Sequence, residues 1–381
     1  MTRVSITKVC DSVDAAFSLA MTRADCTGVI RPGDRVVIKP NWNACAIEGS
    51  TSLPVVLAAC RWAKAQGAGE VIVGEGPVPM QPEAIEAYFK TMGAPEAVAG
   101  AGARFVIFDQ DEHVMFRDLA DLPPEIGVAR LACECDVLIN IPLLKVHSCC
   151  LTTLSVKNLK GCLRPQDKMA FHRVGLLPAV VALNQLVKSQ INVIDAIHAM
   201  AGDHNRGDLI PLGLLMAGRD RVATDAVASA QIGLATGKVP LLKMAAAAGL
   251  GEYRVEKIEI VGEPLAPRRF ELPQERMQRN FPDMGVLEDG ACSACLAALG
   301  DGLYASGGER RFSTLVLGQN ARPPLGALVL GDCLKDYFPT HDHVRGCPPD
   351  GAKIARKLRE GPGEPPCTGQ PPGKPTDDTT N

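Results

Sequence analysis

Basic and amide side chains concentrate in residues 136–172. This segment begins with an apolar run at 137–141, which predicts a buried parallel strand ended by Pro142, and the polar side chains follow the strand. These side chains belong to Lys145, His147, Lys157, Asn158, Lys160 and His172. Cations gathered in so short a span repel one another unless an anion lies among them, and open α/β sheets bind ligands beyond the carboxyl ends of their strands. The segment therefore predicts a basic loop that binds a phosphate or carboxylate ligand. A merely solvated basic loop is the alternative.

Polar residues also follow two other expected strands. The run at 36–43 predicts a strand that Pro40 ends, and the run at 191–197 predicts a strand that ends at Asp195 beside a glycine- and charge-rich loop. We assign candidate catalytic roles to Lys145, His147 and Asp195, with Asp195 orienting a substrate or a lysine. The residues assigned to substrate binding are Lys39, Asn41, Asn43, Lys157, Asn158, Lys160 and His172.

Two carboxylates receive weaker assignments. Glu75 lies at the end of the strand expected at 70–77, where a solvated loop carboxylate is favoured over an acid or base. Asp225 falls in the first turn of an expected helix, and the helix dipole explains a carboxylate there without a function.

Four cysteines near the C-terminus have the spacing of a metal site. Cys292 and Cys295 form a Cys-x-x-Cys pair, and Cys333 and Cys347 follow. Four thiolates suit either a 4Fe–4S cluster or a structural zinc ion, and unliganded buried cysteines are the third interpretation. The cluster is favoured because proline follows Cys347, as in iron–sulfur ligand segments. Pro348 is expected in the first turn of a helix, which would put Cys347 at a helix N-terminus.

Composition limits the classes of partner. The chain has 381 residues, 46% of them hydrophobic, and a formal charge of -3, so we expect neither nucleic acid nor a membrane surface as a partner. Asp11 and Asp14 interrupt the N-terminal segment, and no apolar run approaches about 18 residues, so we expect a cytoplasmic protein. In that compartment the 14 cysteines are expected to be thiols or metal ligands rather than disulfides.

Alternating strand and helix patterns predict an α/β fold with a largely parallel sheet and helices on both faces, plus a small C-terminal α/β module rich in cysteine. We predict an α/β domain at 1–265, a linker at 266–284, the four-cysteine module at 285–360 and a disordered tail at 361–381. The Gly-Glu-Gly at 74–76 lacks the dinucleotide-binding spacing, and the sequence has no P-loop, so we infer no nucleotide cofactor.

Several motifs occur in an order that resembles a known family. They are VVIKPNWN at 36–43, DVLINIP at 136–142, LLKVH at 143–147, SVKNLKG at 155–161, VIDAIHAMAGDHNRGD at 193–208 and MAGRDRVATDAVASAQIG at 216–233. Over about residues 31–235 the chain resembles the "domain of unknown function 362" family. Cys149 and Cys150 depart from the small or polar residues that the resemblance implies, so we expect that the role of this loop can differ from its role in the relatives.

Together these patterns predict an iron–sulfur enzyme that acts on a small anionic organic substrate. Redox chemistry is favoured, and a lyase or dehydratase reaction would follow if one iron were open to substrate. One alternative is a non-catalytic electron carrier that docks a redox partner protein. The other is a zinc-stabilised protein that binds a small molecule.

Overall fold

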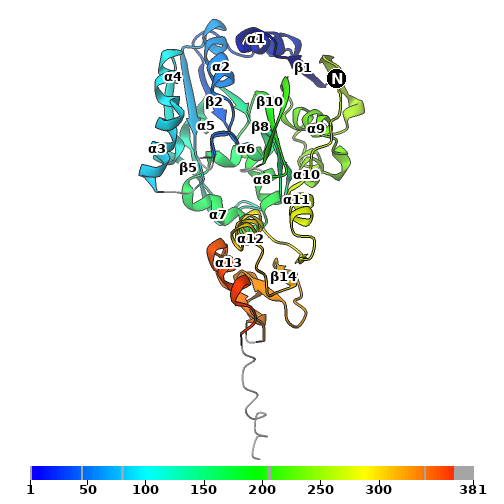
Figure 1. The fold of residues 1–381 in the computed structure, drawn as a ribbon. Helices are drawn as coiled ribbons and strands as arrows, with labels where there is room; N and C mark the ends of the chain where they lie inside the picture. Colours follow the sequence, from blue (N-terminus) through cyan, green and yellow to red (C-terminus); the bar gives the residue numbers. More distant parts are fainter. Residues whose placement is uncertain (1, 44–45, 79–80, 204–206, 339, 364–381) are drawn as a thin grey trace, which may run out of the picture. The chain divides into compact units, whose positions relative to one another are not determined.

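The computed structural model describes residues 2–43, 46–78, 81–203, 207–338 and 340–363, and the chain divides into two compact units, Met1–Asn280 and Phe281–Asn381 (Figure 1). The division falls within the segment 266–284 that the sequence suggested as a linker. Part of that segment forms helix α11, Pro273–Asn280, which belongs to the first unit. In the described part of the chain, no helix is both long and apolar enough to cross a membrane.

Within the described residues, ten strands of the first unit form one sheet. Eight strands follow the order β12-β1-β11-β10-β7-β2-β3-β4, while β8 pairs with β10 and β9 pairs with β8. The pairings of β11 with β1 and β10, and of β8 with β9, are antiparallel, whereas the other pairings are parallel. The strands are β1 Thr2–Lys8, β2 Arg35–Pro40, β3 Glu70–Glu75, β4 Arg104–Ile107, β7 Val137–Ile141, β8 Leu143–His147, β9 Leu151–Thr153, β10 Ile191–Ala201, β11 Asp208–Gly218 and β12 Ile258–Gly262.

Successive side chains of each central strand enter two different hydrophobic cores. Val36 and Ile38 of β2 pack in one core, whereas Val37 between them packs in the other, because side chains alternate across a strand. The helices of the first core are α1 Val13–Arg23, α2 Leu53–Ala65, α3 Pro82–Met92 and α4 Ala94–Gly100. The helices of the second core are α5 Arg130–Glu134, α6 Ser155–Asn158, α7 Pro165–Val174, α8 Leu176–Leu186, α9 Arg221–Gln231 and α10 Pro240–Ala247.

Helices therefore cover both faces of a largely parallel sheet, and the predicted fold class is confirmed. A separate hairpin, β5 His113–Arg117 and β6 Glu125–Ala129, follows β4. Short 3-10 turns complete the first unit: η1 Phe108–Gln110, η2 Leu159–Cys162, η3 Thr236–Lys238 and η4 Val255–Lys257.

The structure corrects two local expectations around residues 143–201. The segment after Pro142 is not a loop, because Leu143–His147 and Leu151–Thr153 form an antiparallel hairpin beside β10. Asp195 does not end its strand, because β10 continues to Ala201. In both places polar residues occur within buried strands, although polar residues in the sequence suggested that each strand had ended.

In its described part, the second unit is a four-stranded parallel sheet with two helices. The strands are β13 Gly285–Glu288, β14 Thr314–Leu317, β15 Leu328–Leu330 and β16 His343–Val344, in that order across the sheet. The helical elements are α12 Ser293–Ala305, η5 Asp332–Tyr337 and α13 Gly351–Glu360. The small α/β module is thus confirmed.

One detail of this module differs from the expectation. The α13 helix begins after Asp350, whose side chain accepts a hydrogen bond from the Lys353 N–H, so Pro348 is not in its first turn. Cys347 therefore precedes the helix by several residues instead of lying at its N-terminus. The residues of the expected disordered tail beyond Gly363 lie outside the described residues.

Candidate functional site

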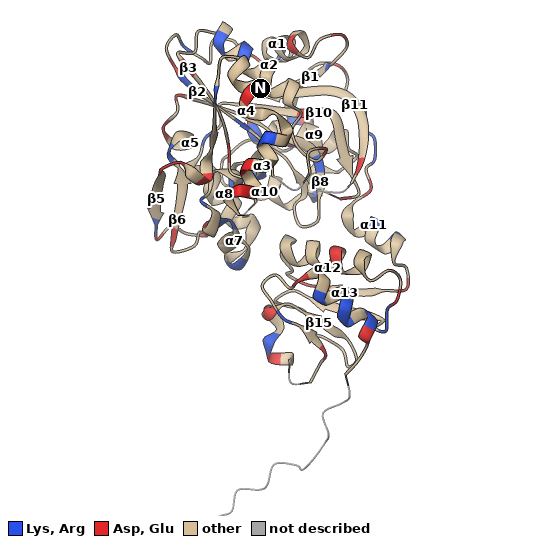
Figure 2. Cartoon of the chain, turned by 60° about the vertical axis from the view of Figure 1, so that its left-hand side comes forward, with Lys and Arg blue, Asp and Glu red and all other residues tan. Residues whose placement is uncertain are grey.

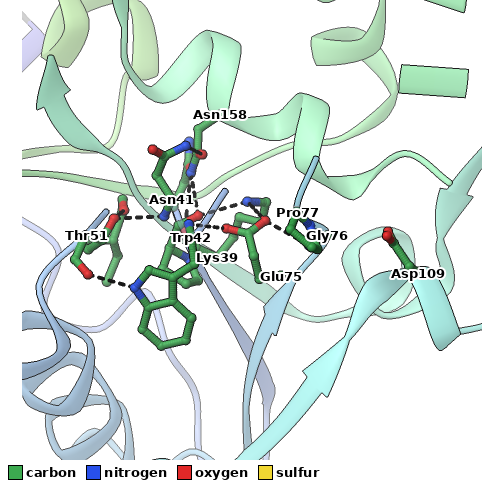
Figure 3. A network of polar contacts seen from close by, with 12 residues as sticks. Lys39, Asn41, Trp42, Thr51, Glu75, Gly76, Pro77, Asp109 and Asn158 are labelled. Carbon is green, nitrogen blue, oxygen red and sulfur yellow. Dashed lines mark hydrogen bonds and ion pairs between the residues drawn. The ribbon is translucent and has the colours of Figure 1, made fainter. Parts of the chain in front are cut away.

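A buried ion pair lies at the carboxyl ends of β2 and β3. The Lys39 ammonium donates to Glu75 Oε1 and, at 2.8 Å, to the Pro40 carbonyl oxygen, and both charged side chains are almost fully buried (Figure 3). Glu75 also accepts from the N–H groups of Trp42 and Gly76, each at 2.8 Å. Burial raises the pKa of the Glu75 carboxyl, and Lys39 with the two N–H groups counters part of that rise. The charge of Lys39 is therefore compensated inside the protein, and Glu75 is not a solvated loop carboxylate.

A chain of asparagine side chains connects β2, β7 and α6. Asn41 Nδ2 donates to Asn158 Oδ1 at 2.9 Å, and Asn158 Nδ2 donates to Asn140 Oδ1 at 2.8 Å and to the Pro40 carbonyl oxygen at 2.9 Å. Asn140 Nδ2 in turn donates to the Ser155 carbonyl oxygen at 2.9 Å. Figure 3 shows Asn158 pointing down from α6 toward Asn41. These amides fix the short helix α6 over the edge of the sheet where the strands end.

A second buried ion pair, which sequence reasoning missed, lies beside the first. Lys168 on α7 donates to Asp109 Oδ1 at 2.7 Å and to the Pro77 carbonyl oxygen at 2.8 Å. Burial lowers the pKa of Lys168, and Asp109 and Glu75 oppose that shift. The other Asp109 oxygen is buried and has no hydrogen-bond partner among the described residues. Asp109 lies near the end of the strand expected at 103–110, and this position at a strand end was the sequence signal that could have identified it.

Two glycines allow the polypeptide backbone to pack directly on these ion pairs. A Cβ atom at Gly161 would lie 2.6 Å from Lys39 Nζ and 2.7 Å from Glu75 Oε1. A Cβ atom at Gly76 would lie 2.3 Å from the Gly161 carbonyl oxygen and 2.9 Å from Lys168 Nζ. The η2 turn thus covers the first ion pair closely, and a side chain at either glycine would displace it.

Lys145 and His147 are buried in β8. Lys145 Nζ donates to the Gly49 carbonyl oxygen at 2.7 Å. His147 Nδ1 accepts from the N–H groups of Cys149 and Cys150 at 3.1 and 3.2 Å, so the imidazole closes the turn of its own hairpin. Both groups have structural partners in the protein, and their catalytic assignment stays a prediction.

The remaining predicted cations lie closer to solvent. Lys160 on η2 contacts His172 on α7, with Nζ and Nε2 2.9 Å apart, and both side chains are partly exposed. Burial raises the pKa of the Cys150 thiol, and the charges of Lys157 and Lys160 oppose the rise. Burial likewise lowers the pKa of Lys157, and Cys150 and Cys149 oppose that shift. The structure therefore brings these two lysines close to the thiols of the β8–β9 hairpin.

Asp195 and Asn43 make hydrogen bonds to backbone groups. Asp195 is fully buried and accepts from the N–H of Ser52 at 2.7 Å and of Ile197 at 3.1 Å. Burial raises its pKa, and the Ser52 contact opposes that rise at the start of α2. The Asn43 carbonyl oxygen accepts from the Val78 N–H at 3.2 Å. Asp195 thus anchors the backbone of Ser52 just before α2 and of Ile197 in its own strand.

The four C-terminal cysteines interact with one another. Cys292 is the N-cap residue of α12, Cys295 is buried in the first turn, and Cys333 and Cys347 are exposed. A hydrogen bond with Cys292 is the main cause that raises the pKa of the Cys295 thiol. Burial and the thiols of Cys333 and Cys347 raise the same pKa further. The four thiols therefore lie in the same region of the second unit.

Among the residues that the structure describes, no three His, Cys, Asp or Glu side chains stand at the spacing needed to hold a single metal ion. A Cβ atom at Gly331 would lie 3.8 Å from Cys295 Sγ, so the backbone before η5 approaches this thiol closely. The donor set is four sulfurs, which fits an iron–sulfur cluster or zinc by its chemistry. The cofactor itself stays a prediction.

Known proteins are similar to parts of this chain. The thylakoid-associated protein sll1697 of Synechocystis sp. is 26% identical over 270 residues, which cover 66% of this chain and 80% of that protein. The lactate racemase apoprotein from Thermoanaerobacterium thermosaccharolyticum superposes with a TM-score of 0.39 at 13% identity, over 57% of this chain and 54% of that chain. Residues 36–230, about half of the chain, match the family described as "Domain of unknown function (DUF362)", and the chain therefore belongs to this family.

Proposed function

We propose that this protein is an iron–sulfur enzyme in which the first unit binds a small organic anion at Lys157, Lys160 and His172, and the second unit holds a 4Fe–4S cluster. The cluster ligands are Cys292, Cys295, Cys333 and Cys347. Redox chemistry on the bound anion is the favoured reaction. The gathering of four cysteines in one small unit, where the thiols of Cys292 and Cys295 are hydrogen-bonded, is the observation that carries this proposal.

The donor set and its setting support the cluster. The four thiols come from the start of α12, from η5 and from the segment before α13, so three separate elements contribute to one group. Cys292 caps α12, where the partial positive charge of the helix N-terminus stabilises an anionic cluster. A bound 4Fe–4S cluster would supply one-electron transfer, or Lewis acidity if one iron lacked a cysteine ligand.

The distribution of compensated charges supports the anion site. The buried lysines of the first unit already have partners: Lys39 pairs with Glu75, and Lys168 pairs with Asp109. Lys160 and His172 are partly exposed and lie next to one another, so an anion can reach them from solvent. Figure 2 shows acidic and basic positions interspersed along the ribbon, in keeping with the formal charge of -3. A local group of cations therefore suits a small anion better than a polyanion.

Metal analysis tests the cluster. We would purify the protein without oxygen, reconstitute it with iron and sulfide, and measure iron, sulfide, zinc and the visible absorption spectrum. Cys295→Ser and Cys347→Ser should lose iron, whereas Cys10→Ser, which changes an exposed cysteine of the first unit, should keep it. Zinc binding without iron would favour the zinc-stabilised alternative. Retention of full iron by both ligand variants would refute the assigned ligands.

Calorimetric titration tests the anion site. Sulfate is a suitable first probe, followed by small mono- and dicarboxylates. Lys160→Ala and His172→Ala should weaken binding, and Lys90→Ala, which removes an exposed lysine of α3, should not. A carboxylate that bleaches the cluster spectrum under anaerobic conditions would identify a substrate, and binding without any spectral change would favour the electron carrier. The cytoplasmic location stays a prediction that cell fractionation checks.

A further inference from the structure

A buried carboxylate, distant in sequence, accepts hydrogen bonds from the first residues of α6. Asp225 lies on α9, is only 2% exposed, and is 70 residues from Ser155 in sequence. Its Oδ1 accepts from the Ser155 N–H at 2.8 Å, and its Oδ2 accepts from the Val156 N–H at 2.9 Å. Each carboxylate oxygen therefore satisfies one N–H group that the first turn of a helix leaves without a partner.

Other buried side chains hold the carbonyl groups of the same two residues. Asn140 of β7 donates to the Ser155 carbonyl oxygen, and Asn184 of α8 donates to the Val156 carbonyl oxygen at 2.8 Å. Arg221 donates to Asn184 Oδ1 at 3.0 Å. A helix of four residues has no stability of its own in water, so these contacts determine where α6 lies.

The charged groups near Asp225 can be named for the described part of the chain. They are Asp220 and Arg221, at the start of α9, whereas α6, α8 and β7 present backbone and amide groups. Burial raises the pKa of Asp225 to about 7, the Val156 and Ser155 groups oppose the rise, and Asp220 adds to it. Protonation would replace one acceptor by an O–H donor, which would leave a buried N–H of α6 without its partner.

We infer that Asp225 is a positioning residue for the anion site, because its ionised carboxylate holds α6 in the orientation that presents Lys157 and Asn158. This inference rests on the proposed function. The α6 helix leads directly into η2, which carries Lys160, so a loosened α6 would disturb both lysines of the site. The carboxylate does not touch the anion in this scheme. Its effect on binding passes through two backbone N–H groups.

The test compares two matched aspartates on one helix. Asp220 accepts from three backbone N–H groups, those of Val222 and Ala223 at the start of α9, which it caps, and that of Glu252. We expect Asp225→Asn to weaken sulfate binding about tenfold at pH 8, because a charged acceptor of two hydrogen bonds is lost. Asp220→Asn should bind sulfate as the wild type does. Equal losses in both variants would overturn the inference, since they would indicate general damage to α9.

The pH profile supplies a second readout. Sulfate keeps its charge between pH 6 and 8. Relative to Asp225→Asn, the wild type should lose its advantage as the pH falls from 8 to 6, because protonated Asp225 no longer holds both N–H groups. A constant ratio between the two affinities across this range would contradict the inference.

Hydrogen exchange of the wild type separates this inference from the proposed function. Without sulfate, the amides of Ser155 and Val156 should lose protection below pH 7 after correction for intrinsic exchange rates. Protection that stays constant from pH 6 to 8 would refute the positioning role, even if Asp225→Asn fails to fold. If protection changes as expected while wild type does not bind sulfate or carboxylates, the positioning of α6 stands and the proposed anion site is refuted.

Discussion

The buried pair of Lys39 and Glu75 gives the sharpest prediction of stability. Glu75→Gln keeps a side-chain carbonyl group but leaves the Lys39 ammonium without a counter-charge at a position that is 1% exposed. Removal of one partner from a buried ion pair costs about 3–5 kcal/mol of the free energy of unfolding. Replacement of both partners by uncharged groups of similar size, as in Lys39→Met with Glu75→Gln, should cost much less. We expect a coupling energy of about 2–4 kcal/mol in this double-mutant cycle.

Urea denaturation followed by tryptophan fluorescence measures this energy. Both tryptophans of the chain, Trp42 and Trp62, lie in the first unit, so the signal reports the unfolding of that unit alone. Trp42 also donates its backbone N–H to Glu75, which places the fluorophore beside the perturbation. Urea carries no charge and leaves the ion pair unscreened. Destabilisation by the double variant that equals the sum of the two single variants would refute a stabilising pair.

Three further predictions concern the same edge of the sheet. Gly161→Ala should destabilise the first unit by about 1–3 kcal/mol in urea, because its methyl group would overlap the ion pair, whereas Gly237→Ala, whose Cβ meets no atom within 4 Å, should not. His147→Ala should cost about 2 kcal/mol, because two N–H groups of the hairpin turn would lose their acceptor, and an unchanged melting temperature would contradict this. For Asp225 the folded state keeps a proton up to pH 7 that the unfolded state loses near pH 4, so this group's contribution to stability falls as the pH rises between those values. The free energy of unfolding of Asp225→Asn relative to wild type should therefore rise by about 3 kcal/mol from pH 5 to pH 8, and parallel curves would show that the carboxyl titrates normally.

The sequence predicted the architecture because hydrophobic periodicity determines which side chains can be buried. Apolar runs at 36–38 and 137–141 gave the central parallel strands, and the motifs located the family region to within several residues of its limits at 36 and 230. The hairpin at 143–153 was missed because its lysine and histidine suggest exposure. They are tolerated in the core because Lys145 donates to the Gly49 carbonyl oxygen and the turn of the hairpin donates two N–H groups to His147, and hydrophobic periodicity does not reveal either partner.

The sequence predicted several residues of the candidate site but not the partners with which they pair. Lys39, Asn41 and Asn158 do meet where the strands end, as expected from strand polarity. Of the two buried carboxylates, Glu75 was assigned as solvated and Asp109 was missed. A carboxylate at the end of a strand looks the same in sequence whether it is solvated or paired. Only the tertiary structure brings Lys39 of β2 to Glu75 and Lys168 of α7 to Asp109. The four cysteines were assigned as metal ligands from their spacing alone, and that assignment stays a prediction.

The position of β1 has a practical consequence for anyone who produces this protein in pieces. The strand Thr2–Lys8 is inserted between β12 and β11, although all of Thr2–Lys8 and β12 lies outside the family limits at 36 and 230. A fragment trimmed to those limits would leave β11 as a bare edge, whose free backbone groups would recruit neighbouring molecules and promote aggregation. Expression of residues 1–280 keeps that edge covered, and the smallest soluble fragment should therefore be longer than the family domain at both ends.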